Sequence, residues 1–262
     1  MKVKNIRGKI VCVFSAKGGI GKTTTVLNLA GIYQKLDKKV LIIDLDLSGG
    51  AIAVALNKVP EKSVYNIIDD MDNNRYNSLG SYVTKYNDKI DFLAAPKDPR
   101  QAPKIDSKYL DLILDKAIYS YDVVLIDTNH IISEINLAAL EKSDRVLFMV
   151  TNDPYDLKNM KSLLSVFRDL EFKKYKILLN NSRDPLKNYF SLYDLRNILK
   201  DNIDYTLSPK FYIKNIDDYV INGKIITLDD KCASVCATDY TTLVGLATDF
   251  LEEEKKGEDS EK

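Results

Sequence analysis

The sequence predicts an α/β protein in which helices cover both faces of a doubly wound, mostly parallel sheet. Apolar runs of strand length alternate along the chain with longer segments of helical periodicity. Several runs, such as residues 123–126, are apolar at consecutive positions, which is typical of strands buried on both faces. Hydrophobic residues make up 45% of the 262, and no repeat or Gly/Ser/Pro-rich linker divides the chain. We therefore expect one domain over residues 1–253, followed by a charged tail at 254–262.

Seven segments have the length and composition of strands, and six segments between them have helical periodicity. The expected strands are Lys9–Phe14, Val40–Asp44, Ile90–Ala94, Val123–Asp127, Val146–Val150, Lys176–Asn180 and, with the weakest pattern, Tyr205–Leu207. The expected helices are Lys22–Leu36, Ser107–Tyr119, Ser133–Leu140, Leu157–Leu170, Tyr189–Leu199 and Asp239–Glu254. In the first helix, Val26, Leu29, Ala30 and Tyr33 recur at the spacing of one helix face.

Charge and composition exclude several classes of protein. The 38 basic and 38 acidic residues give a net charge of zero, which argues against wholesale disorder and against a generally basic nucleic-acid-binding surface. Neutrality hides local asymmetry, because residues 1–22 hold six basic side chains and no acidic one. No apolar stretch is long enough to span a membrane, and no signal peptide is recognisable. The three cysteines make no disulfide framework, so we expect a cytoplasmic protein in which Cys232 and Cys236 are ordinary thiols.

The strongest functional signal lies between the first expected strand and the first expected helix. The segment reads Lys17-Gly18-Gly19-Ile20-Gly21-Lys22-Thr23-Thr24. Its glycines allow backbone N–H groups to turn inward around phosphate oxygens, and the helix N-terminus adds its positive end. Lys22 would reach the β- and γ-phosphates, the Thr23 hydroxyl would join the Mg²⁺ shell, and Thr24 would add a hydroxyl at the α-phosphate. The segment therefore predicts a site for a nucleoside triphosphate with Mg²⁺.

The loop departs from the general phosphate-loop pattern at its start, where Ala16 replaces the first glycine and Lys17 follows directly. This form resembles the deviant Walker A loop of the MinD/ParA ATPases, a group of P-loop NTPases, and the resemblance covers about residues 9–250. It implies ATP and Mg²⁺ as cofactors. It also implies that Lys17 crosses a dimer interface to the partner's nucleotide, so that an ATP-sandwiched homodimer is expected. The alternative for Lys17 is a solvated loop lysine.

Acidic residues end two of the expected strands. Asp44 and Asp46 follow one apolar run and Asp127 ends another, so all three are expected at the carboxyl edge of the sheet, where ligands bind. The resemblance assigns Asp46 to orienting the attacking water and Asp44 to supporting the Mg²⁺ region. It makes Asp127 the end of a Walker B-like strand, holding Mg²⁺ through a water. The alternative for Asp44 and Asp46 is to cap the following turn.

The segment after Asp127 differs from the family pattern, which has a switch II containing Pro and Gly. Here Asn129 and His130 stand at that place, which leaves open whether the segment supports hydrolysis. For His130, the only histidine, an accidental loop position is favoured over proton transfer or γ-phosphate sensing.

The resemblance also implies a site for the base. It assigns Asn180, at the end of an expected strand, to the adenine edge, with Asn181 one step away as the alternative. Pro209 resembles the proline of the family's loop beside the base.

Within the family, residues 44–51, 62–68 and 92–96 resemble the CpaE/TadZ branch, the MinD-like ATPases of Flp/Tad pilus assembly. This implies a slow, partner-stimulated ATPase whose dimerisation positions a pilus or secretion machine, recruited to a cell pole or the inner membrane face through a protein partner. The alternatives are a ParA-type partition ATPase that binds DNA, a non-hydrolysing scaffold, and a metabolic relative such as a synthetase. The late helices hold no dense Lys/Arg cluster and the last runs into acidic residues 252–254, which disfavours DNA binding and a direct membrane anchor.

Overall fold

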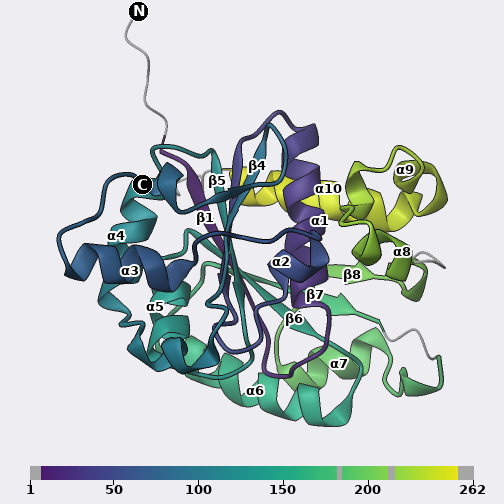
Figure 1. Cartoon of the computed structure of the whole chain (residues 1–262). Coiled ribbons are helices and arrows are strands. Elements are labelled where there is room, and N and C mark those ends of the chain that lie inside the picture. The colour runs from purple at the N-terminus through teal and green to yellow at the C-terminus, as the bar shows by residue number, and fades with distance from the viewer. Residues whose placement is uncertain (1–6, 182–184, 212–215, 253–262) are drawn as a thin grey trace, which may run out of the picture.

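One sheet runs through the protein, whose computed structural model describes residues 7–181, 185–211 and 216–252 (Figure 1). Its strands are β1 (Lys9–Phe14), β2 (Val40–Leu45), β3 (Thr84–Lys85), β4 (Ile90–Leu93), β5 (Val123–Thr128), β6 (Arg145–Val150), β7 (Tyr175–Asn180) and β8 (Tyr205–Leu207). They lie in the order β3-β4-β2-β5-β1-β6-β7-β8, and only the pairing of β3 with β4 is antiparallel among the described strands. The mostly parallel α/β sheet expected from the sequence is confirmed.

Helices cover both faces of this sheet (Figure 1). One face is packed by α3 (Val64–Asp72), α4 (Lys108–Ala117), α5 (Glu134–Lys142), α6 (Pro154–Asp169) and α7 (Leu192–Leu199). The other is packed by α1 (Lys22–Lys35), α2 (Ile52–Ala55), α8 (Ile216–Ile221), α9 (Cys232–Val235) and α10 (Ala237–Leu251). This is the doubly wound arrangement that the sequence predicts.

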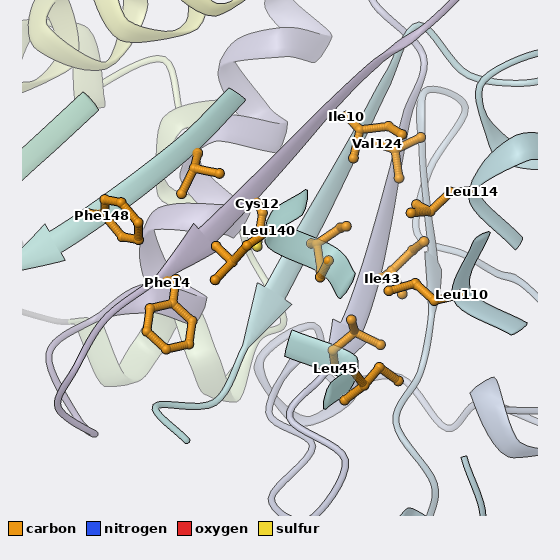
Figure 2. Close-up of a cluster of buried hydrophobic side chains, with 14 of the residues drawn as sticks. Ile10, Cys12, Phe14, Ile43, Leu45, Leu110, Leu114, Val124, Leu140 and Phe148 are labelled. Carbon is orange, nitrogen blue, oxygen red and sulfur yellow. The ribbon is translucent and has the colours of Figure 1, made fainter. Parts of the chain in front are cut away.

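The central strands supply side chains to two separate apolar clusters. Ile10, Cys12 and Phe14 of β1 belong to the cluster beneath α4 and α5, where Figure 2 shows them beside side chains of those helices. Val11 and Val13 point the opposite way, into the cluster beneath α1. Since both faces of β1 are buried, every position in it favours an apolar residue, and this explains the consecutive runs in the sequence.

Two helices begin three residues away from the expected position, and local capping explains each difference. Helix α6 begins early, at Pro154, because Asp153 N-caps it and proline suits the first helical position. The segment expected as Tyr189–Leu199 becomes helical only from α7 onward, because Ser191 and Asp194 form a capping box there. The short elements α2, α3, α8, α9 and β3 were not predicted.

Other expectations concern composition and the chain ends. Cys12, Cys232 and Cys236 are free and buried. Across the three described stretches of chain, no helix is long and apolar enough to cross a membrane. The tail expected at 254–262 lies outside the described residues.

The topology gathers the predicted site at one edge. Strands β2, β4 and β5 lie on one side of β1, and β6, β7 and β8 lie on the other, so the chain crosses over β1 after β5. Ligands of open α/β sheets bind at such a switch point, outside the carboxyl ends of the strands. The loop that follows β1 lies at this point. Asp44 and Asp127 are direct register partners at the same edge.

Candidate nucleotide-binding site

The glycine-rich loop, residues 15–21, joins the carboxyl end of β1 to the first turn of α1. Gly19 and Gly21 have φ angles of 73° and 96°, in the left-handed region that glycine enters without steric cost. Gly21 N-caps α1 without a side-chain hydrogen bond, and the first turn of α1 carries no acidic residue. The N-terminal amides and the positive end of α1 are therefore left for an anion.

Lys22 folds back over the loop that precedes it. The residue is 8% exposed, and its Nζ donates a hydrogen bond to Ser15 Oγ at 2.8 Å. Ser15 Oγ in turn donates to the carbonyl oxygen of Lys17 at 2.7 Å, so the ammonium lies at the beginning of the loop. Burial lowers the pKa of Lys22, although nearby carboxylates oppose that shift. A bound anion would stabilise this desolvated cation.

Thr23 and Asp127 meet where the metal is predicted. Thr23 Oγ1 donates to Asp127 Oδ2 at 2.6 Å, which joins α1 to the end of β5. Asp127 is fully buried, and its Oδ1 atom has no hydrogen-bond partner among the described residues. Burial raises the pKa of Asp127 to about 7, against the opposing effects of Thr23 and Lys22. An orphaned carboxylate oxygen beside a hydroxyl fits Mg²⁺, which takes oxygen ligands and uses one or two carboxylates together with phosphates and waters.

Asp44 and Asp46 lie at the same edge but have contacts of their own. The two oxygens of Asp44 accept hydrogen bonds from the backbone amides of Asp46 and Ile52, both at 3.1 Å. Asp46 is half-buried, and its Oδ1 accepts the amide of Gly49 at 3.2 Å. Both side chains therefore make the turn-capping contacts of the alternative. The support of the Mg²⁺ region by Asp44 and the orienting of the attacking water by Asp46 stay predictions.

Lys17 is anchored within its own subunit. Its Nζ lies 3.0 Å from Asp153 Oδ2, and the two side chains are 41% and 33% exposed. Asp153 also N-caps α6, where its side chain accepts the amides of Tyr155 and Asp156. Lys17 is therefore a partly exposed loop lysine that is ion-paired within its own subunit, and its role toward a second subunit stays a prediction. A contact with a second subunit would require this ion pair to break.

A buried amide holds the segment after β5. Asn136 of α5 donates from Nδ2 to Asn129 Oδ1 at 2.7 Å and to the carbonyl oxygen of Ile131 at 2.8 Å. The Ile131 amide donates to the same Asn129 oxygen at 2.9 Å. His130, between them, is exposed, and its imidazole lies against the Cα position of Gly18. The segment that departs from the family pattern therefore contacts the glycine-rich loop.

The residues predicted beside the base lie at neighbouring strand ends. Asn180 ends β7 and is the register partner of Leu207 in β8, and Pro209 begins a 3-10 turn just beyond. The Asn180 side chain is buried, and its Nδ2 donates to the carbonyl oxygen of Ile20 at 2.8 Å. Asn180 thus supports the glycine-rich loop in this structure. Its contact with a base, like that of Pro209, stays a prediction.

Three residues that shape the site were not identified from the sequence: Ser15, Asn136 and Asp153. The sequence does indicate a place for Asp153 at the site. It follows the apolar run of β6, and Asp127 ends the apolar run of β5, so both lie at the same edge of the sheet. The sequence indicates no such place for Ser15 and Asn136, since a serine or asparagine in these positions reads as an ordinary turn or helix residue.

Comparison with known proteins shows the family and the fold of the chain. The sequence matches the AAA_31 family, described as an AAA domain, over residues 8–180, more than half of the chain. It is similar to the chromosome-partitioning ATPase Soj of Thermus thermophilus, with 26% identity over 215 residues that cover 79% of each protein. The fold is similar to that of a ParA family ATPase from Chlorobium tepidum (TM-score 0.76, 19% identity, covering 92% of this chain and 98% of that one). It is also similar to MinD with Mg-ADP from Pyrococcus horikoshii (TM-score 0.73, 16% identity, covering 92% and 95%).

Proposed function

The chain belongs to the AAA_31 family and to the MinD/ParA group of P-loop ATPases, and from that premise we propose that it is a Mg-ATP-dependent dimerisation switch. The observation that carries the proposal is the pairing of Thr23 with a buried Asp127 whose second oxygen has no partner, next to a buried lysine in a glycine-rich loop. That arrangement suits a phosphate chain with its metal. Hydrolysis is proposed to be slow and stimulated by a partner.

Each part of the loop then has a task. Gly18, Gly19, Ile20 and Gly21 supply backbone amides to the phosphates, and Thr24 supplies a hydroxyl. Lys22 exchanges its hydrogen bond to Ser15 for one to the β- and γ-phosphate oxygens. Asn180 and Pro209 lie beside the base.

The carboxylates would manage the metal and the water. Thr23 and Asp127 would hold Mg²⁺, and Asp44 would support the region by fixing the turn that follows β2. When bound, Mg²⁺ neutralises charge on the β- and γ-phosphates. Asp46, half-buried at the same edge, orients the water that attacks the terminal phosphate.

Dimerisation depends on Lys17. In the single chain its ammonium is paired with Asp153, and both side chains are accessible at the surface. We propose that a second copy, loaded with ATP, offers phosphates that replace Asp153 as the partner of Lys17. Hydrolysis removes the terminal phosphate and returns the lysine to its own subunit.

The cellular role we propose is to position a partner assembly from the cytoplasm, at a pole or at the inner membrane face. The likeness of residues 44–51 and 62–68 to the CpaE/TadZ branch supports a Flp/Tad-type pilus or secretion machine as that assembly. The likeness to Soj supports a second candidate, a partition ATPase that binds DNA. Multiple-turnover phosphate release, measured alone, with DNA and with lipid vesicles, separates these candidates from a non-hydrolysing scaffold, which would release no phosphate beyond one turnover.

Lys22→Ala tests the phosphate loop itself. We expect nucleotide binding to be lost, because the substitution removes the charge that faces the β- and γ-phosphates. The matched control is Lys58→Ala, which removes an exposed lysine outside the loop and should leave affinity unchanged. Calorimetric titration with Mg-ATP measures both, and micromolar affinity retained by Lys22→Ala would refute the assignment.

A further inference from the structure

The absence of a side chain at Gly18 is explained by a neighbouring side chain, that of His130, rather than by a positive φ angle. Gly19 and Gly21 have positive φ angles, whereas Gly18 is not among the glycines with that conformation. A Cβ atom on Gly18 would lie 3.2 Å from His130 Nδ1, which is tighter than ordinary van der Waals contact, and 3.4 Å from its Cε1. The missing side chain at position 18 therefore makes room for the imidazole of His130 to lie against the loop.

The backbone on both sides of His130 is fixed, whereas its imidazole is free to bind. Asn136, which is completely buried, donates to Asn129 Oδ1 and to the carbonyl oxygen of Ile131. The Ile131 carbonyl also accepts the amide of Ser133 at 3.0 Å. Within residues 7–181, 185–211 and 216–252, nothing is hydrogen-bonded to the imidazole. The fixed backbone thus places an imidazole N–H of His130, which can donate a hydrogen bond, beside the glycine-rich loop.

The position of Lys22 locates the terminal phosphate. A phosphate-loop lysine reaches the β- and γ-phosphates, and the Nζ atom of Lys22 lies at Ser15, whose hydroxyl contacts Lys17. We therefore expect the outer end of a triphosphate near the beginning of the loop, close to Gly18. That is the residue against which the imidazole of His130 lies.

We propose that His130 is a specificity-determining residue that donates a hydrogen bond to the terminal phosphate and so distinguishes ATP from ADP. The inference rests on the proposed nucleotide site and adds to it a residue from the segment after β5. Because a diphosphate leaves the outer end of the loop empty, the imidazole contributes to ATP affinity and not to ADP affinity. Asn136 is the positioning residue that keeps the imidazole in place.

The test compares His130→Phe, which keeps a ring against Gly18 but has no donor, with His130→Gln, which keeps an N–H donor. Affinities for ADP and for the non-hydrolysable analogue AMPPNP are measured by calorimetry with Mg²⁺, and light scattering follows oligomeric state in each titration. We expect His130→Phe to weaken AMPPNP binding about 10- to 100-fold, the range for a hydrogen bond to a charged group, and to leave ADP affinity within about twofold. His130→Gln should recover most of the loss.

The possible results are distinct. Equal weakening of both nucleotides, or no change in either, overturns the role of His130 and leaves the phosphate-loop assignment intact. Failure of the unmodified protein to bind either nucleotide overturns the proposed function and this inference together. Loss of AMPPNP affinity that His130→Gln does not recover also overturns the hydrogen bond, because a donor of similar reach is then present without effect.

Discussion

In the proposed switch, the ion pair between Lys17 and Asp153 competes with dimerisation, and one substitution should bias that competition. Asp153→Asn removes the charge that holds Lys17 in its own subunit. Asparagine is as good an N-cap as aspartate, so the start of α6, where Asp153 accepts two backbone amides, should be preserved. We therefore expect the substitution to strengthen ATP-dependent dimerisation without destabilising the fold.

The expected size follows from the exposure of the pair. With side chains 41% and 33% exposed, the pair belongs with surface ion pairs, which contribute about 0.2–1 kcal/mol each. Burial pushes the pKa of Asp153 upward, but the Lys17 ammonium and the backbone amides of α6 outweigh it and hold the pKa below its ordinary value. A symmetric dimer breaks two such pairs, so removing both should tighten the dimer by about 0.4–2 kcal/mol, or about 2- to 30-fold.

The assay is sedimentation equilibrium with ATP in an Asp46→Ala background, in which hydrolysis should not deplete the dimer. Asp88→Asn is the matched control, because it removes one aspartate from an exposed ion pair with Lys85, away from the loop. Lys17→Ala should stay monomeric whether residue 153 is Asp or Asn. A dimer that is unchanged or weakened by Asp153→Asn would show that Asp153 does not compete for the lysine.

Two further results are expected at the carboxylates. Asp46→Ala should still bind ATP and accumulate as a dimer, with phosphate release reduced about 100-fold or more because the water is no longer oriented; turnover at the native rate rejects that role. The folded-state pKa of Asp127 is raised to about 7 from 3.8, so the metal-free protein should lose up to about 4 kcal/mol of stability as the pH rises through that window. Asp127→Asn should remove this loss. The free energy of unfolding is measured by urea titration at pH 5 and pH 8 in EDTA. If it depends on pH equally in the variant and the unmodified protein, the loss does not come from a buried, uncompensated charge on Asp127.

The sequence predicts the strands of the sheet well because strands buried on both faces have apolar residues at consecutive positions. Strands β1, β2 and β5 begin at the expected residues and end within one residue of expectation, since each contains an uninterrupted run of at least four apolar residues. The four-residue helices α2 and α9 and the two-residue β3 are too short for any periodicity to appear. Helix α3 depends on a capping box between Ser63 and Asn66, an asparagine variant of the usual Ser-x-x-Glu signal.

The segment Lys17–Thr24 is predictable because its candidate phosphate-binding groups lie in eight consecutive residues. The contacts that tune it are not, because they join distant parts of the chain: Thr23 to Asp127, Lys17 to Asp153, and Gly18 to His130. Sequence patterns indicate which residues reach the carboxyl edge of the sheet. They do not indicate which of those residues pair there, because that depends on the tertiary packing of α5 and α6 against the strands.

Lys17 and Lys22 have different surroundings, and under the proposed function this difference sets an order of events. Lys22 is buried, its pKa is lowered by desolvation, and a neutral hydroxyl is its partner, so it gains much from an incoming phosphate. Lys17 is exposed and already paired with a carboxylate, so it gains little until a second set of phosphates is presented to it. ATP should therefore bind the single chain first and recruit the second chain afterwards. In the proposed switch, dissociation should be easy for the same reason, because Lys17 can pair with Asp153 again when the terminal phosphate is cleaved.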